Sequence, residues 1–339
     1  MIRVGVIGLG FGAAVHVPAF ASLPGVQVVA LGGQRSAKAR ELASGLGIAF
    51  GGTIDEVLGA GLDAVTIALP PEAGAQVAQA ALARRLAVMA EKPLAHTVER
   101  AEALARLAEG CTTAVGFELA ELECFQALKR ALESQARPGS VRLSWCTRSY
   151  AHSNRIWNWK TDRRRHGGVM NLLGSHILYL AEWLFGPLAE IRATYSDERT
   201  AAFAPPGEQP AEDRASLQVV TAGGVRIGIE LDNAAGESGM RWELDLPQGR
   251  LLLEERAGGG LALGRTGGAS PELLATDIPP AGVDWRIAPF RRLAGRFAGC
   301  VPQRAACTPD FRAGARVQRL LEFAAESARR NGAPLVIAP

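Results

Sequence analysis

The chain has 339 residues, of which 48% are hydrophobic and 21% charged, and its formal net charge is +3. This composition excludes a mainly disordered chain, which is too polar to bury a core, and it predicts about two domains of ~150 residues each. The net charge is too small to indicate nucleic-acid binding. No apolar run approaches the ~18 residues of a membrane span. We therefore expect a soluble protein that binds neither nucleic acid nor a membrane.

Cysteine usage and the N-terminus predict a cytoplasmic location. The five cysteines form no C-x-x-C pair, which is typical of reduced thiols rather than of a disulfide framework. The chain opens directly into an apolar run, without the charged segment and cleavage site of an export signal. The five histidines show no metal-ligand spacing, so we expect no metal.

The first 118 residues alternate β-branched runs with helical stretches, a pattern typical of a parallel sheet wrapped by helices. We therefore predict an α/β Rossmann domain over residues 1–118. Thr53 and Glu56 form a capping box that opens a short helix. The expected strands cover residues 2–7, 26–31, 64–68, 87–90 and 113–116, and the expected helices cover residues 13–23, 37–45, 72–85 and 97–109.

Beyond residue 118 the pattern changes to that of an α+β domain, which we predict over residues 119–339 with its last helix packing back at the domain boundary. Gly-rich turns separate the later strands, as in an antiparallel meander. We expect helices over 119–134, 172–185 and 308–330, strands over 141–147, 191–195, 215–221, 225–231, 241–246 and 250–255, and surface loops over 204–210 and 258–280.

A glycine-rich turn follows the first strand and has the pattern G-x-G-x-x-A. The first glycine allows the tight turn, the second lets the backbone approach a pyrophosphate, and a small third residue lets helix and strand pack closely. Such turns also occur for packing alone, but here the turn lies within a β-α-β pattern. We therefore predict dinucleotide binding by Gly8, Gly10, Phe11, Gly12 and Ala13.

The end of the second strand bears on the choice of nucleotide. An acidic residue there would hold the ribose 2′-hydroxyl of NAD, but the chain reads Gly33-Gln34-Arg35-Ser36. Arg35 and Ser36 can instead hold a 2′-phosphate through a charged fork and a hydroxyl. The alternative is that Arg35 is a solvated residue before a helix. We favour NADP(H), with NAD(H) as the alternative.

The motif Glu91-Lys92-Pro93 ends the fifth expected strand, at the sheet edge where ligands of such folds bind. Pro93 keeps Lys92 out of helical geometry, and partial burial would lower its pKa toward that of an acid–base catalyst. A surface ion pair is the structural alternative.

A second motif, Gly167-Gly168 followed by Gly174 and His176, enters an apolar helix. Each glycine there costs about 1 kcal/mol against alanine, which indicates close approach of a ligand or backbone. A lone histidine among apolar residues is otherwise more often a satisfied core residue.

Together with His16 in the first helix, these three motifs resemble the Gfo/Idh/MocA oxidoreductases. The resemblance covers the order and spacing of the motifs over residues 1–186, and the later strands agree more loosely. It implies a Rossmann domain followed by a domain with a large open, mostly antiparallel sheet. It also implies a homodimer or homotetramer packed through that sheet, and hydride transfer between a nicotinamide and a sugar, polyol or related carbonyl compound.

The resemblance also implies roles for individual residues. Lys92 would hydrogen-bond the reacting oxygen and help to move its proton, and His176 would be the general acid–base or a proton relay. Leu69 and Pro70 would cover the cofactor, and Glu91 would lie near its nicotinamide end.

The chain departs from the family pattern beside His176. Members usually carry an aspartate four residues before this histidine, where the chain has Leu172. Asn171 lies five residues before His176 and, in an α-helix, would point away from the face that 172 and 176 share. Leu172 cannot accept a proton and would make the site drier. After the sixth expected strand, members often carry arginines and asparagines, and this chain instead has Gly116-Phe117-Glu118-Leu119-Ala120-Glu121.

A basic and aromatic stretch over residues 148–166 includes Trp159 and Arg163. With Asn171 and Leu172 we place these two residues at the substrate, where they would suit an anionic or nucleotide-linked sugar ring. Single-stranded nucleic acid is disfavoured by the net charge, and a solvated loop is the structural alternative.

Three functions remain open from the sequence. The leading one is an NAD(P)-dependent oxidoreductase acting on a sugar-like or other cyclic alcohol or carbonyl compound. The second is a cofactor-binding regulatory protein without turnover, which Leu172 keeps open. The third is redox-neutral chemistry, such as glycoside cleavage, with a tightly bound cofactor.

Overall fold

The computed structural model describes residues 1–134, 137–247, 249–256, 259–267 and 271–338. The chain forms two compact units. The first comprises Met1–Glu121 and Pro280–Gln318, and the second comprises Leu122–Pro279 and Arg319–Pro339. These units differ from the division at residue 118, which stays a prediction, in assigning a late segment of the chain to the first unit.

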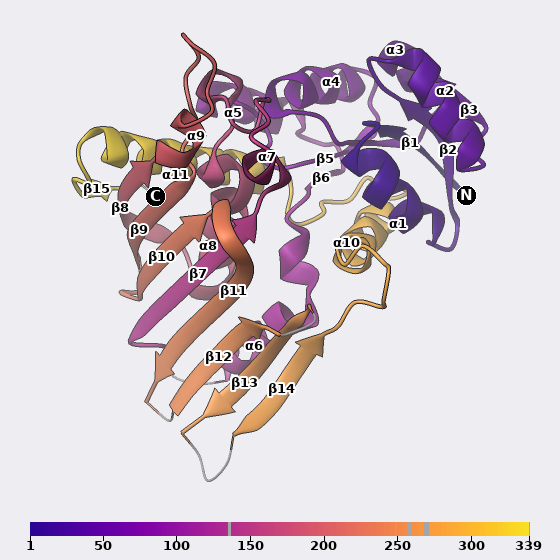
Figure 1. The fold of residues 1–339 in the computed structure, drawn as a ribbon. Coiled ribbons are helices and arrows are strands. Elements are labelled where there is room, and N and C mark those ends of the chain that lie inside the picture. The colour runs from indigo at the N-terminus through magenta and orange to yellow at the C-terminus, as the bar shows by residue number, and fades with distance from the viewer. Residues whose placement is uncertain (135–136, 248, 257–258, 268–270, 339) are drawn as a thin grey trace. The chain divides into compact units, whose positions relative to one another are not determined.

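The first unit contains a six-stranded parallel sheet in the order β3-β2-β1-β4-β5-β6 (Figure 1). The order reverses between β1 and β4, so the carboxyl ends of these strands form the edge where doubly wound folds bind ligands. The Rossmann prediction is confirmed. The strands are β1 (Ile2–Ile7), β2 (Val26–Gly32), β3 (Phe50–Gly52), β4 (Ala64–Ile67), β5 (Ala87–Ala90) and β6 (Thr113–Val115).

Helices cover this sheet. Phe20 on α1 packs against Phe290 and Phe297 on α10, in a cluster with the sheet residues Val4 and Met89. Thr53 and Glu56 form the predicted capping box. The helices are α1 (Val17–Ala21), α2 (Ser36–Gly45), α3 (Ile54–Leu58), α4 (Pro71–Ala83), α5 (Val98–Leu107) and α10 (Ile287–Cys300).

Two predicted helices differ in the structure. The helix expected over 13–23 begins as a π-helix over Gly12–His16 before α1. The helix expected over 119–134 is a 3-10 turn over Glu118–Glu121 followed by α6 (Glu123–Glu133). A contact from a distant strand accounts for where α6 starts. The Asp277 carboxylate accepts hydrogen bonds from the backbone N–H groups of Glu123 and Cys124, at 2.9 and 2.8 Å.

The second unit contains a nine-stranded sheet in the order β14-β13-β12-β11-β7-β10-β9-β8-β15 (Figure 1). Only the β7–β10 pair is parallel among the described pairs of this sheet, which confirms the mostly antiparallel prediction. The strands are β7 (Ser140–Arg148), β8 (Leu188–Ser196), β9 (Arg214–Thr221), β10 (Arg226–Asp232), β11 (Ala234–Leu246), β12 (Gly249–Glu255), β13 (Leu261–Thr266), β14 (Glu272–Asp277) and β15 (Leu335–Val336).

The loop predicted over 258–280 was wrong where the structure describes it, because β13 and β14 form a hairpin there. Its glycines led us to predict a loop, yet Leu261 and Leu263 are buried strand residues. Residues 258 and 268–270 of that stretch lie outside the described residues.

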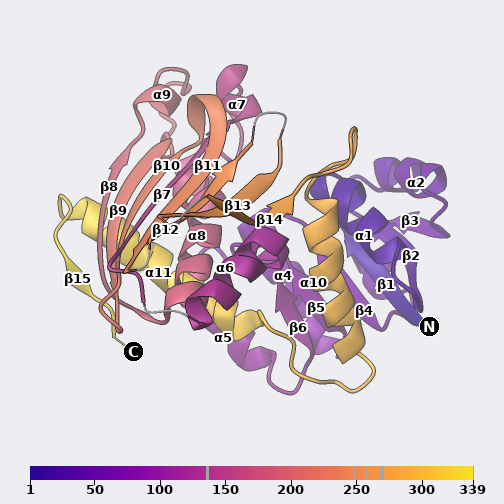
Figure 2. The same ribbon diagram turned by 90° about the horizontal axis from the view of Figure 1, so that it is seen from below.

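The helices α6 and α8 (Ser175–Phe185) lie on the same side of the nine-stranded sheet (Figure 2). Phe125 on α6 meets Trp242 on β11, and His176 on α8 meets Trp145 on β7. The unit also contains the short helices α7 (Tyr150–Ser153) and α9 (Glu198–Ala201), and α11 (Phe311–Arg329) includes the boundary between Gln318 and Arg319. Within the described residues, no helix is both long and apolar enough to cross a membrane.

Candidate functional site

The three glycines of the turn after β1 have different surroundings. Gly8 has a φ of +132°, and a Cβ there would lie 2.3 Å from the Ala68 carbonyl oxygen. A Cβ on Gly12 would lie 3.3 Å from Val6, where helix and strand pack. A Cβ on Gly10 would meet nothing within 4 Å, so the backbone there faces open space. The turn, continued by Phe11 and Ala13, therefore fits a dinucleotide pyrophosphate.

The residues that follow β2 carry positive charge. Arg35 immediately precedes α2 and is exposed, and among the described residues its guanidinium makes no hydrogen bond or ion pair. The Ser36 hydroxyl accepts a hydrogen bond from Arg40 at 3.4 Å. Arg40 is thus a second cation beside Ser36. The sequence analysis missed Arg40 because this residue lies one helical turn beyond Ser36.

A buried imidazole joins three elements at the carboxyl edge of the sheet. His16 is 0% exposed. Its Nδ1 lies 2.7 Å from the Thr66 hydroxyl on β4, and its Nε2 lies 3.2 Å from the Glu91 carboxylate after β5. An ionised carboxylate can only accept, so in that state Nε2 donates to Glu91. The ring stacks on Phe290 at 4.0 Å.

Glu91 and Lys92 lie where β5 ends. Lys92 is half-buried and precedes Pro93 through a cis peptide bond. The Glu91 carboxylate also fills the space beside Gly116, where a Cβ would lie 2.5 Å from Oε1. Leu69 and Pro70 follow β4 at the same edge, and Pro70 is the residue directly before α4.

Glu118, just beyond β6, is a buried carboxyl group that our sequence analysis did not assign to the site. It is 4% exposed, and within the described residues its Oε2 has no hydrogen-bond partner. Burial, reinforced by the nearby Glu91, raises its pKa to about 8, whereas Lys92 and Arg286 act in the opposite direction. The carboxyl group therefore holds a proton at neutral pH.

Residues from the late segment of the chain complete this edge. Arg286 pairs with Asp284 at 2.6 Å, and its guanidinium lies over the Phe11 ring at 4.9 Å. Phe290 supplies the ring beneath His16. No local motif marks these residues, and only the fold brings them to the nucleotide turn.

His176 belongs to the second unit, whereas Lys92 belongs to the first. His176 is 5% exposed, and its ring centroid lies 6.0 Å from that of Trp145. The helix expected over 172–185 begins as a π-helix over Met170–Gly174. The α-helical spacing on which we separated Asn171 from His176 does not apply to this turn. The Asn171 amide donates to the Gly167 carbonyl at 3.2 Å, and half-buried Leu172 follows it.

The glycines before His176 accommodate protein atoms. A Cβ on Gly167 would lie 2.4 Å from the Lys160 carbonyl oxygen, and one on Gly168 would lie 2.2 Å from the Glu212 carboxylate. Glu212 accepts a hydrogen bond from the Met170 N–H at 3.2 Å, and burial raises its pKa to about 7. Close approach of the backbone thus explains why residue 167 is a glycine. Glu212 is a carboxyl group that the sequence analysis missed.

The basic stretch is only partly directed at a cavity. Arg163 pairs with Asp197 at 2.8 Å and is exposed, and the Lys160 ammonium lies 5.8 Å from the Trp159 ring centroid. Arg148, His152 and Arg155 instead line a cavity of the second unit. Trp159 and Arg163 do not line that cavity.

Comparison with protein families accounts for both units. Residues 2–117 match the model of an oxidoreductase family with an NAD-binding Rossmann fold, and residues 125–252 match the GFO/IDH/MocA C-terminal domain. The chain belongs to the Gfo/Idh/MocA family. The family resemblance and the prediction of an oxidoreductase are therefore confirmed.

Individual proteins match this Gfo/Idh/MocA chain over nearly its whole length. An uncharacterized oxidoreductase of Synechocystis sp. is 30% identical over 344 residues, which cover 95% of this chain and 92% of that protein. A levoglucosan dehydrogenase structure with NADH and levoglucosan has a TM-score of 0.86 at 18% identity, covering 99% of both chains. A putative myo-inositol dehydrogenase from Sinorhizobium meliloti has a TM-score of 0.81 at 20% identity, covering 100% of both chains. These two structures share the fold of this Gfo/Idh/MocA chain.

Proposed function

We propose that the chain is an NAD(P)-dependent dehydrogenase that transfers a hydride between nicotinamide and a sugar-like or other cyclic alcohol or carbonyl compound. The observation that carries this proposal is the position of Lys92, half-buried at the carboxyl end of β5. Its neighbour Glu91 is held by His16, in the π-helix that begins at the glycine turn. The ring compounds in the names of the relatives, levoglucosan and myo-inositol, support this substrate class.

Oxidation of a secondary alcohol releases a hydride and a proton. The nicotinamide, when bound, accepts the hydride, and the proton must leave the alcohol oxygen. Lys92 would hydrogen-bond that oxygen and help to move its proton, and His176 would accept the proton as the general base or pass it on as a relay. Leu172 supplies no carboxylate, so a proton must leave His176 by another group or by water. Asn171, Trp159 and Arg163 remain substrate-side proposals.

For the cofactor we favour NADP(H). Three features support this choice: no carboxylate lies between β2 and α2, Arg35 is free of partners among the described residues, and Arg40 adds a second cation beside Ser36. NAD(H) is the alternative, since the family model is that of an NAD-binding fold and the levoglucosan dehydrogenase structure holds NADH.

A fluorescence titration with NADPH and NADH tests this cofactor choice. We expect tighter binding of NADPH, and an about tenfold or greater loss of that preference in Arg35→Ala. The control is Arg106→Ala, an exposed arginine on α5 paired with Glu102. Equal or tighter binding of NADH by the unmodified protein would overturn the NADP(H) proposal.

Turnover is tested with NADP⁺ and NAD⁺ against levoglucosan, myo-inositol and glucose. We expect nucleotide reduction with at least one compound, and a loss of about 10²-fold or more in kcat for Lys92→Met and for His176→Asn. Nucleotide binding without turnover on a broader panel of cyclic alcohols and ketones would favour the regulatory alternative. Unchanged kcat in both variants would remove these residues from the reaction.

We also infer a cytoplasmic homodimer or homotetramer packed through the sheet of the second unit. The described cysteines all carry free thiols, which supports a reducing compartment. The family resemblance supports the assembly. Light scattering coupled to size exclusion gives the mass in solution, and a monomer would contradict the assembly.

A further inference from the structure

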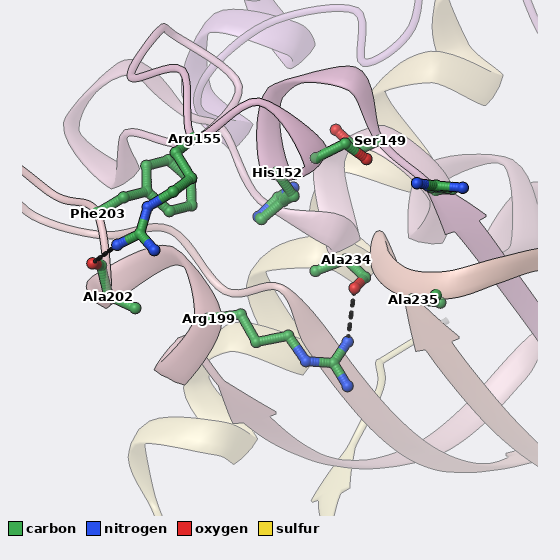
Figure 3. A pocket seen from close by; sticks show the side chains of 11 residues that line it. Ser149, His152, Arg155, Arg199, Ala202, Phe203, Ala234 and Ala235 are labelled. Carbon is green, nitrogen blue, oxygen red and sulfur yellow. Dashed lines mark hydrogen bonds between the residues drawn. The ribbon is translucent and has the colours of Figure 1, made fainter.

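The second unit contains a cavity of about 330 Å³ between α7, α9 and the start of β11 (Figure 3). Its lining includes Arg148, Arg155 and Arg199, and no aspartate or glutamate is among the lining residues. The three arginines come from the end of β7, from the turn after α7 and from α9. The fold therefore directs positive charge from three separate elements to one cavity.

The three guanidinium groups are held in different ways. Arg199 donates to both carboxylate oxygens of Asp232, at 3.0 and 2.9 Å, and to the Ala234 carbonyl at 2.8 Å. Arg155 donates to the neutral Ala202 carbonyl at 2.6 Å and, among the described residues, makes no ion pair. The Arg148 side chain makes neither a hydrogen bond nor an ion pair within the described chain. Asp232 thus offsets one charge, and those of Arg148 and Arg155 remain.

His152 forms a neutral and fixed part of the wall. The Thr200 hydroxyl donates to the Asp213 carboxylate at 3.2 Å, so its oxygen accepts from His152 Nε2 at 3.0 Å. Burial lowers the pKa of His152, although Asp213 and Asp232 oppose this shift. The ring also packs edge-on against Phe203 at 5.7 Å. The remaining positive charge therefore comes from the arginines, while Ser149 and Ser153 add hydroxyl groups to the lining.

We propose that this cavity binds a small hydroxylated organic anion, whose phosphate or carboxylate group is held by Arg148 and Arg155. Guanidinium groups form charge-assisted, forked hydrogen bonds with both kinds of anion. The volume suits a molecule the size of a single sugar ring. Hydroxyl groups on such a ligand would meet Ser149 and Ser153. The assignment concerns a ligand site of the second unit and does not depend on hydride transfer.

Isothermal titration calorimetry on the full chain, without nucleotide and at fixed ionic strength, tests this site. The probes are D-glucose 6-phosphate, D-gluconate and neutral D-glucose. We expect at least one of the two anions to bind saturably, with one anion per chain, and we expect no binding of glucose. Comparing the two anions shows whether the site prefers a phosphate or a carboxylate group. Binding should weaken with added salt.

Variants then locate the binding. Arg148→Ala and Arg155→Ala should each weaken anion binding about tenfold or more, and Arg155→Lys should weaken it less. Arg142→Ala is the matched control, since Arg142 is exposed on the same strand as Arg148 but pairs with Glu243. The proposal is overturned if neither anion binds, if glucose binds as well, or if the control loses as much affinity. Because the titration contains no nucleotide, its failure leaves the proposed dehydrogenase untouched.

Discussion

The imidazole of His16 lies 2.7 Å from the Thr66 hydroxyl and 3.2 Å from the Glu91 carboxylate, with no exposure to water. This ring links the helix after the glycine turn to the ends of β4 and β5. Because Lys92 follows Glu91 directly, the imidazole also restricts where the Lys92 backbone lies. A residue that we took from the sequence only as part of a family pattern is therefore a structural support of the nucleotide edge.

His16→Ala should destabilise the protein by about 3 kcal/mol, because it opens a cavity against Phe290 and takes a hydrogen-bond partner from buried Thr66 and half-buried Glu91. Thr66→Val removes one of the two hydrogen bonds and should cost about 1 kcal/mol. Chemical denaturation of both variants measures the two free energies of unfolding. An unfolding midpoint of His16→Ala equal to that of the unmodified chain would show that the His16 ring does not stabilise the folded protein.

The buried carboxyl group of Glu118 predicts a pH dependence of stability. Its pKa is raised to about 8 in the folded chain, against an ordinary value of 4.5. Between these two values the folded state binds the extra proton, so the free energy of unfolding falls as pH rises. Glu118→Gln resembles the protonated carboxyl group and should flatten this slope. At pH 9 the variant should be the more stable protein by an amount on the order of a few kcal/mol.

Denaturation at pH 5 and pH 9 measures this difference. Glu109→Gln is the control, because Glu109 is exposed and, within the described part of the chain, its carboxylate pairs only with the exposed Arg312. A control that flattens the slope equally, or a Glu118→Gln variant whose stability follows pH as the unmodified chain does, would contradict the prediction.

The strand pattern of the first unit could be read from the sequence because its strands are continuous apolar runs between helices. The runs at Ile2–Ile7 and Ala87–Ala90 have the predicted bounds. Phe50–Gly52 was missed because three residues with two glycines carry no such signal. The hairpin of β13 and β14 was missed because glycine content outweighed the alternation of buried leucines.

The candidate site divides in the same way. The glycine turn and the Lys92 motif are local patterns, so spacing alone located them at the edge of the sheet. Glu118, Arg286 and Phe290 could not be assigned from spacing, because burial and distant contacts give them their surroundings. The π-helix at Met170–Gly174 also escaped prediction, because periodicity does not distinguish it from the start of an α-helix.

Arg40 should contribute to the choice of nucleotide. Its guanidinium donates to the Ser36 hydroxyl, which orients that group and adds positive charge at the start of α2. Arg40→Ala should weaken NADPH binding about threefold to tenfold and leave NADH binding unchanged. Lys38→Ala, an exposed residue of the same helix, is the control in the fluorescence titration. Equal losses for both nucleotides would mean that Arg40 supports the helix rather than a 2′-phosphate.

Gly168 is a position before His176 where the chain should tolerate a side chain poorly. Its φ is +101°, and a Cβ would lie 2.2 Å from the half-buried Glu212 carboxylate. Gly168→Ala should therefore destabilise the protein by about 2–4 kcal/mol, through backbone strain and displacement of Glu212 from the Met170 N–H.

Gly228→Ala is the control for Gly168→Ala, since a Cβ there meets nothing within 4 Å and its φ is not positive. It should change stability by less than about 1 kcal/mol. Thermal denaturation of both variants makes the comparison. Glu212→Ala alone and Glu212→Ala combined with Gly168→Ala are measured beside them. Because removal of the carboxylate relieves the clash but not the strain, the double variant should lose less stability than the two single changes added together. Strict additivity would mean that Glu212 does not restrict position 168.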